Sequence, residues 1–355
     1  MPLPSVDNTY TTVPLRGKKS ALYRRYLQLE DDRSSWRSHW QEITDYITPR
    51  RGRYLIESQN SKGRKRTTKI IDSTGTQAMR TMAAGLMSGM TSPARPWHRR
   101  KVREDLMDDG EVRAWLSQVE HIERSILHKS NFYNSIHTVY TELGSFGTAP
   151  LYRQPSFDSV IRFRPDGKMD WSGVSKATHK LWDDGNYDAR IEIVHVIEPR
   201  LMADRDYDKK DGKNMPFKSC YFELSSETDD FLMESGYKKF PAYVPRWDVL
   251  SGEVYGRSPG MDNLGDIKQL QHQQKRKAQA IDKMVNPPMV APTSLKGKPS
   301  TVLPGQTTYV DPLQGSQSFA PAYQVQPRIN ELMMDIQEVQ NRVQRGFYAD
   351  LFAMM

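Results

Sequence analysis

The sequence predicts an α+β fold in which helical regions toward both ends of the chain flank a β-rich middle. Before residue 145 and again after residue 259, apolar residues recur at three- and four-residue steps, as on one face of an α-helix. Between about residues 150 and 255 the pattern changes to short alternating runs bounded by turn residues, which indicates strands.

The composition limits the classes of protein that remain possible. At 355 residues, the chain can hold two or three ordinary domains or one elongated subunit. The formal charge of +8 leaves a polyanionic partner open, although many basic proteins bind no nucleic acid. The single Cys220 excludes an internal disulfide and fits a reducing compartment. We expect no contact with a membrane, because no apolar run approaches the length of a span and the start, MPLPSVDNTY, has no signal-peptide pattern.

The stretch DSTGT at residues 72–76 looks like the phosphorylation loop of a cation pump, in which the aspartate attacks ATP. That interpretation fails, because a pump needs membrane helices and a lysine after the aspartate, where this chain has Ser73. We interpret Asp72 as a structural residue at a helix start, where negative charge is favoured. Thr74 and Gln77 have the spacing of a capping box.

The helix that starts there is expected to end before Pro93, and Gly85 and Gly89 would let another backbone approach it closely. Other helices are predicted at about residues 19–46, 108–131 and 134–143. Strands are predicted in a hairpin at residues 159–171, in RIEIVHVIEPR and in SCYFEL. His195 lies in one of these strands and is interpreted as structural. The basic loop RRGRYLIESQNSKGRKRT is either a solvated surface loop or a phosphate contact.

Two long helices are predicted in the last third of the chain. From Asp262 to Val285 only Gly265 opposes a helix, and that length corresponds to about 36 Å. Residues 287–326 form a segment punctuated by proline and glycine, with a strand expected at residues 306–310. The last helix begins near Pro327 and carries a heptad seam of Ile329, Leu332, Ile336, Val339 and Val343.

No catalytic constellation emerges from the sequence. It contains no phosphate-binding glycine loop, no dinucleotide fingerprint and no Cys/His cluster at zinc spacing. Paired carboxylates such as Asp183–Asp184 and Asp229–Asp230 lie in turn-like stretches, where we expect them to be solvated. We therefore expect no enzymatic activity, no cofactor and no metal site.

Several blocks, taken together and in order, resemble the portal proteins, or head-to-tail connectors, of short-tailed bacteriophages. The blocks are WRSHWQEITDYITPRRGRY, DSTGTQAMRTMAAGLMSGMTSPARPW, ELGSFGTAPLY, GEVYGRSPGMDNLGDIKQL, VNPPMVAP, GQTTYVDP and FYADLF, and they extend over most of residues 30–352. The resemblance implies a ring of about twelve subunits at one capsid vertex, through which double-stranded DNA passes during packaging and ejection. It also implies three partners, the packaging motor (terminase), the tail adaptor protein and the major capsid protein, with assembly in the host cytoplasm and a final location in the virion.

The plan of that family can be laid over this chain. Residues 1–258 would form a wing, helical at 20–145 and β-rich at 150–255, and residues 259–286 the first stem helix. Residues 287–326 would form a small α/β clip and residues 327–355 the second stem helix. Family members continue past FYADLF into a tunnel loop and a crown. This sequence stops shortly after that block, so we expect a longer natural chain.

The predicted functional surface is a set of cations on the two stem helices. On a helical wheel, Lys268, His272, Lys275 and Lys283 fall together, with Arg276 at the margin. We expect the cations of this stripe to face the DNA channel, with two arginines of the last helix near its inner end. The predicted channel residues are Lys268, Lys275, Arg276, Lys283, Arg342 and Arg345.

Three alternatives stay open at this point. The stripe could instead meet acids of the neighbouring subunit, such as Asp266 or Asp282. The whole chain could be a monomeric basic factor that binds nucleic acid, or a structural capsid or tail subunit that does not contact DNA.

Overall fold

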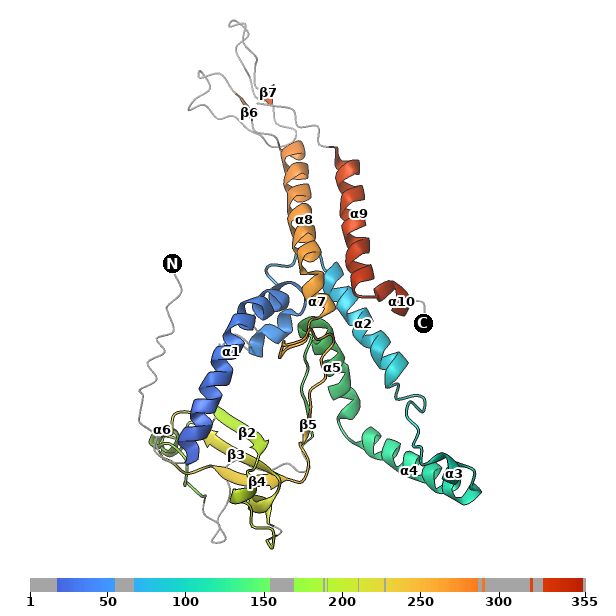
Figure 1. Cartoon of the computed structure of the whole chain (residues 1–355). Helices are drawn as coiled ribbons and strands as arrows, with labels where there is room; N and C mark the ends of the chain where they lie inside the picture. The colour runs from blue at the N-terminus through green and yellow to red at the C-terminus, as the bar shows by residue number, and fades with distance from the viewer. Residues whose placement is uncertain are drawn as a thin grey trace, which may run out of the picture. The chain divides into compact units, whose positions relative to one another are not determined.

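The computed structural model describes residues 18–54, 67–153, 169–187, 189, 191–209, 211–226, 228–286, 289–290, 320–321 and 328–353. Figure 1 shows the order of its helices and strands. The chain divides into two compact units. The first comprises Met1–Gln41, Leu55–Gly63 and Pro150–Pro245, and the second comprises Glu42–Tyr54, Arg64–Ala149 and Arg246–Met355. Helices with small antiparallel sheets confirm the predicted α+β class.

The first unit is built on a three-stranded antiparallel sheet with the strand order β2-β3-β4. Its elements are α1 (Lys18–Tyr46), which continues into the second unit, β1 (Leu151–Tyr152), α6 (Lys176–Asp183), β2 (Ile193–Pro199), η2 (Met202–Asp204), η3 (Gly212–Asn214), β3 (Phe217–Glu223), β4 (Met233–Tyr237) and β5 (Ala242–Tyr243). The short strands β1 and β5 form a separate antiparallel pair.

The core of the first unit lies between the start of α1 and the sheet. Leu22 of α1 forms a buried cluster with Cys220 and Phe222 of β3. Alternate residues of a strand point to opposite faces, so these two β3 side chains share the face that α1 covers. Burial raises the pKa of the Cys220 thiol to about 11, so the group stays protonated at neutral pH.

Two buried charged groups fix elements to this sheet. Lys19 of α1 donates through Nζ to the carbonyl oxygen of Ser226 at 2.9 Å. Glu223 of β3 accepts hydrogen bonds from the backbone N–H and the hydroxyl of Ser175, at 2.9 and 2.6 Å. Ser175 is also the N-cap of α6, so one carboxylate ties that helix to the sheet. Buried charges are tolerated only with such partners.

His195 of β2 has a structural environment, as its strand position predicted. Its Nε2 is 2.8 Å from the Ser219 hydroxyl, and its ring stacks on Tyr221 with centroids 3.8 Å apart. Burial lowers the pKa of His195 to about 4, so the imidazole is neutral at pH 7.

The second unit is mostly helical. Its elements are the end of α1, η1 (Pro49–Tyr54), α2 (Thr74–Met90), α3 (Glu104–Met107), α4 (Gly110–Lys129), α5 (Phe132–Phe146), α7 (Pro259–Asp262), α8 (Leu264–Val285), β6 (Met289–Val290), β7 (Ala320–Pro321), α9 (Ile329–Gly346) and α10 (Ala349–Ala353). The helix α2 packs mainly against α5, α9 and α10.

Small residues let helices approach α2 closely. Gly144 of α5 lies against the side chains of Met79 and Met82, where a Cβ atom would come within 2.6 Å of both terminal methyl groups. Gly85 of α2 has the side chain of Phe352 from α10 directly over it, so it admits an aromatic ring rather than the backbone we expected. Gly89 is exposed.

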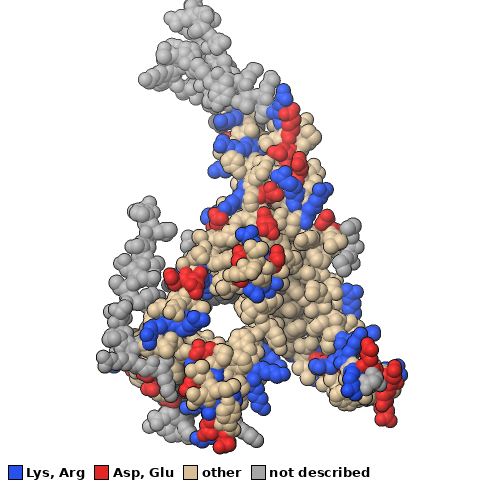
Figure 2. Space-filling model, in the orientation of Figure 1, with Lys and Arg blue, Asp and Glu red and all other residues tan. Residues whose placement is uncertain are grey.

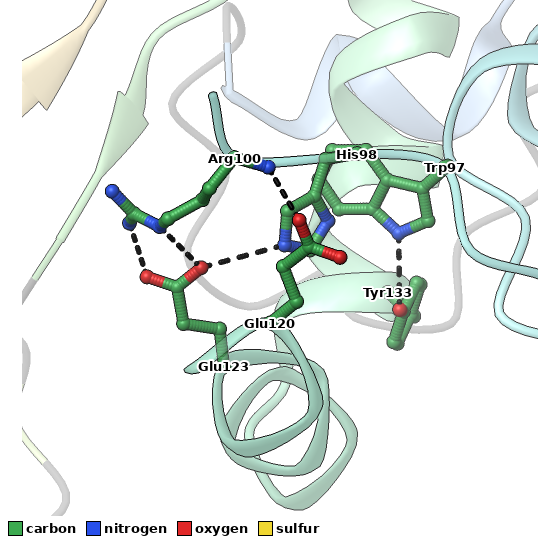
Figure 3. A network of polar contacts seen from close by, with 6 residues as sticks. All are labelled: Trp97, His98, Arg100, Glu120, Glu123 and Tyr133. Carbon is green, nitrogen blue, oxygen red and sulfur yellow. Dashed lines mark hydrogen bonds and ion pairs between the residues drawn. The ribbon is translucent and has the colours of Figure 1, made fainter. Parts of the chain in front are cut away.

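A polar network fastens the segment between α2 and α3 to α4 and α5 (Figure 3). Arg100 Nε donates to Glu123 Oε2 at 2.9 Å, and His98 Nε2 lies 3.5 Å from the same carboxylate. Trp97 donates through its indole N–H to the hydroxyl of Tyr133 at 3.3 Å. The hydrogen bond from Arg100 lowers the pKa of Glu123. Because this ion pair is exposed to water, we expect it to orient the segment more than to stabilise it.

Most predicted helices are confirmed within a few residues, but the predicted capping box is wrong. Thr74 and Gln77 form no capping box, because Ser73 is the N-cap and Gln77 donates to its hydroxyl at 3.0 Å. Asp72 Oδ1 instead accepts from the N–H of Thr74 at 2.8 Å, in the manner of an Asx turn. The short elements α6 and β4 were not predicted.

Some predictions lie wholly or largely outside the described residues. They are the hairpin at 159–171, the strand at 306–310 and most of the basic loop. In the part of the chain that the structure describes, no helix is both long and apolar enough to cross a membrane. The same residues contain no group of three His, Cys, Asp or Glu side chains that could hold a metal ion.

We predict that Gly147→Ala destabilises the second unit more than Gly252→Ala. Both glycines have positive φ, 74° and 91°, so an alanine at either costs about 1–2 kcal/mol of backbone strain. Only at Gly147 would the new Cβ also overlap backbone, at Gly256, which should add about 1–3 kcal/mol. Urea unfolding followed by tryptophan fluorescence measures both losses. Equal losses would show that the contact at Gly147 is looser than described.

Candidate nucleic-acid interface on the α8–α9 hairpin

The helices α8 and α9 run antiparallel and pack side by side in the second unit (Figure 1). At 1.5 Å per residue, α8 is about 33 Å long and α9 about 27 Å. α8 starts at Leu264 and α9 at Ile329, and each start lies two residues after the predicted one. The second half of the predicted seam of α9 is confirmed, because Ile336, Val339 and Val343 are buried.

The start of α2 is bound to α8 through the backbone. Gln271, a buried residue of α8, accepts through Oε1 from the N–H groups of Ile71 and Asp72, at 2.6 and 2.7 Å. Its Nε2 donates to the carbonyl oxygen of Asp72 at 2.9 Å. One amide side chain therefore satisfies three backbone groups that precede α2. Beside it, Ile267 of α8 packs against Gly75 of α2.

The carboxylate of Asp72 joins three helices. Oδ1 accepts from the N–H of Thr74 at the start of α2, and Oδ2 accepts from Gln274 of α8 and Gln340 of α9, each at 2.9 Å. Burial raises the pKa of Asp72, but the hydrogen bonds from Thr74, Gln340 and Gln274 outweigh it, so the net pKa is below the usual value. The carboxylate is therefore charged at neutral pH and holds the hairpin to α2.

Two of the predicted channel cations are paired within the chain. Lys268 Nζ lies 2.8 Å from Glu42 Oε1 and 5.8 Å from the centroid of the Tyr46 ring. Arg342 of α9 bridges to Asp266 of α8 at 3.2 Å and also contacts Glu338 at 3.5 Å. Asp266 was considered above as a partner in a neighbouring subunit, and here it pairs with an arginine of its own chain. Because acids of the same chain partly neutralise them, Lys268 and Arg342 add less to the positive electrostatic potential of the surface than to the packing of the helices.

The other four predicted cations are exposed. Arg276 donates through Nε to His272 Nε2 at 3.3 Å, one turn earlier on α8. Among the described residues, Lys275, Lys283 and Arg345 form no ion pair. Figure 2 shows Lys and Arg side chains along the α8 side of the hairpin and a mixture of acidic and basic side chains over α9. The net positive surface of the hairpin is therefore carried by α8.

Sequence reasoning identified Asp72 as structural but missed its partners. The signal was present, because Gln271, Gln274 and Gln340 fall next to apolar positions that face the interior. An amide at the margin of a buried seam needs a hydrogen-bond partner. Without the fold, however, nothing in the sequence indicates that one carboxylate supplies it.

The chain belongs to the family of bacteriophage head to tail connecting proteins, whose model matches residues 19–166 and 168–355. It is 40% identical over 369 residues to a protein named "Probable portal protein" in Bordetella phage BPP-1. It is 39% identical over 370 residues to the "Portal protein" of Salmonella phage epsilon15. Each match covers 95% of this chain and 66% of the relative, so the chain spans just under two thirds of their length.

We predict that Gln340→Ala lowers the free energy of unfolding by about 1.5–3 kcal/mol, because a hydrogen bond to the charged Asp72 is lost. Asn341→Ala is the matched control. That residue is exposed and adjacent on the same helix, and its loss should stay within about 0.5 kcal/mol. Urea titration at pH 7 gives both values. A Gln340→Ala variant as stable as the control would mean that the contact adds nothing.

A second prediction concerns pH. Because the pKa of Asp72 is lower in the folded chain than its ordinary value of 3.8, its charged form stabilises folding. That contribution is complete well above pH 3.8 and disappears as the pH falls through the folded-state pKa. The stability difference between the natural chain and Asp72→Asn should therefore be largest at pH 6–7 and shrink below pH 3.8. Unfolding curves at a series of pH values test this, and a difference that does not change with pH would contradict it.

Proposed function

We propose that this chain is a portal subunit, which forms a ring at one capsid vertex and gives double-stranded DNA a path into and out of the virion. The observation that carries the proposal is the match of 95% of the chain to two portal proteins at about 40% identity. The protein would act as a structural connector rather than as an enzyme. Its partners would be other copies of itself, about twelve per ring, together with the packaging motor, the tail adaptor and the major capsid protein.

The plan of the subunit follows the same resemblance. We assign residues 1–258 to the wing, 259–286 to the first stem helix, 287–326 to the clip and 327–355 to the second stem helix. In this assignment α7 and α8 belong to the first stem segment, and α9 and α10 to the second. The second compact unit would then contain α2 to α5 of the wing as well as the stem helices, and α2 packs against α9 within it.

The physics of a DNA channel suits the charge of the hairpin. Duplex DNA carries a phosphate every 1.7 Å or so along its axis, so a helix of about 33 Å spans about 20 of them. A few separated cations attract this backbone without fixing one register, because phosphate contacts carry no sequence information. Lys275, Arg276, Lys283 and Arg345 are the exposed candidates. Lys268 and Arg342 would act more weakly, since acids of the same chain partly neutralise them.

The proposal predicts rings with an open centre. Electron microscopy of the purified 355-residue chain should show closed rings, and native mass spectrometry should give one multiple of the 41.0 kDa subunit mass. When a ring is docked in a solid-state nanopore, duplex DNA driven by voltage should produce discrete current blockades. A monomer that retains duplex DNA would favour the simple nucleic-acid-binding factor instead. Rings that never pass duplex DNA would favour a structural subunit without a DNA path.

A further inference from the structure

One exposed face of α9 carries no charge. Its residues are spaced four, three, four and three apart, which places them along a single stripe of the helix. We call this set the amide stripe, and it consists of Asn330, Met334, Gln337, Asn341 and Gln344. All five are exposed, and Met334 is 66% exposed. Among the described residues, the four amide side chains form no hydrogen bond.

The charged residues of α9 lie mainly beside this stripe, and most of them form a hydrogen bond or an ion pair with another residue. Asp335 accepts from Gln273 of α8 at 2.5 Å, and Arg342 bridges to Asp266 of α8. Glu338 pairs with Arg342 on the same helix. The acidic residues therefore lie toward α8 or pair with a cation, although α9 as a whole is rich in charge. A long exposed stripe without charge on such a helix needs an explanation.

The position of α2 determines which face of the hairpin is free. α2 contacts α8 at Ile267 and α9 on its buried side, which includes Ile336. At 100° per residue, Met334 and Asn341 lie roughly 140–160° around α9 from Ile336, and the other three residues of the stripe lie roughly 80–120° from it. The amide stripe thus lies outside the buried seam of α9, and Met334 and Asn341 are turned furthest from it.

The same reasoning applies to α8. Arg276 and Lys283 lie roughly 160–180° around α8 from Ile267. α8 and α9 are antiparallel neighbours, and α2 meets the hairpin at the start of α8 and toward the end of α9 (Figure 1). The sides of the two helices that point away from these contacts form one outer face of the hairpin. That face combines two cations from α8 with the amide stripe from α9, and Arg345 lies next to the stripe.

We propose that the amide stripe is the part of the channel wall along which duplex DNA slides, an inference that rests on the proposed portal function. Amide groups can exchange weak hydrogen bonds with phosphate oxygens and water, but they neither hold the backbone as lysines would nor repel it as carboxylates would. The cations of α8 attract the polyanion, and the neutral stripe keeps it mobile. A wall of this composition permits movement in both directions.

A contact with the next subunit is the rival explanation for the stripe. Helix interfaces at this spacing are filled by apolar side chains, whereas four of these five positions are amides. If they were buried, each amide would need partners for its donors and its acceptor. A surface that stays in water and faces a moving ligand has no such requirement. The composition therefore favours DNA over a second copy of the chain.

The test introduces charge on the stripe. Gln337→Lys/Asn341→Lys should still form rings, because both positions face solvent in the proposed channel. In a docked ring under a KCl gradient, the pore should become more selective for anions. The dwell time of duplex DNA should increase, and the slope of its logarithm against log salt should steepen by roughly 0.9 for each added phosphate contact. The reverse pair, Gln337→Glu/Asn341→Glu, should shift selectivity toward cations and shorten the dwell.

The control places the same charge elsewhere. Ser117→Lys/Gln118→Lys changes two exposed residues of α4 and should leave both readouts at their natural values. Loss of rings in both stripe variants but not in the control would assign the stripe to a subunit contact and overturn the proposal. Intact rings with unchanged selectivity and dwell would place the stripe outside the channel. If the natural chain itself forms no rings, the portal function fails first and the inference fails with it.

Discussion

The carboxylate of Asp72 is the interaction on which the arrangement of the long helices depends. It is charged and partly buried, so it is stable only while Thr74, Gln274 and Gln340 donate to it. These donors come from α2, α8 and α9. A shift of either long helix along its axis would leave a charge without partners, and this fixes the register of the hairpin far more sharply than apolar contacts can. Gln271 reinforces the arrangement by binding the backbone just before α2.

This polar centre divides the hairpin into two kinds of surface. One side packs on α2 through Ile267 and the seam of α9. The outer side contributes nothing to that packing, so its composition is free to serve a ligand. The pairing of Lys268 with Glu42 and of Arg342 with Asp266 removes two of the predicted cations from that side. What remains is sparse positive charge on α8 and neutral amides on α9, and the proposed DNA path rests on this composition.

The long helices could be predicted from sequence because their signals are local and repeated. Trp36 and Ile43 in α1 and Ile336 and Val343 in α9 recur at helical spacing over several turns. The short elements could not be predicted, since β4 contains serine and glycine and is held as a strand by pairing with β3. The α8 cations of the candidate site were predicted from the helical wheel. Which of them are paired depends on residues far away in sequence, such as Glu42 and Lys268, so the fold was needed to distinguish them.

The one cysteine of the chain has a practical consequence. Cys220 is only 1% exposed, and with a thiol pKa of about 11 it holds almost no reactive thiolate at neutral pH. The natural chain is therefore expected to react very slowly with maleimides and other thiol reagents. A cysteine engineered at any solvent-facing position would be the dominant target, so fluorophores or spin labels could be attached one per subunit without first removing a native residue.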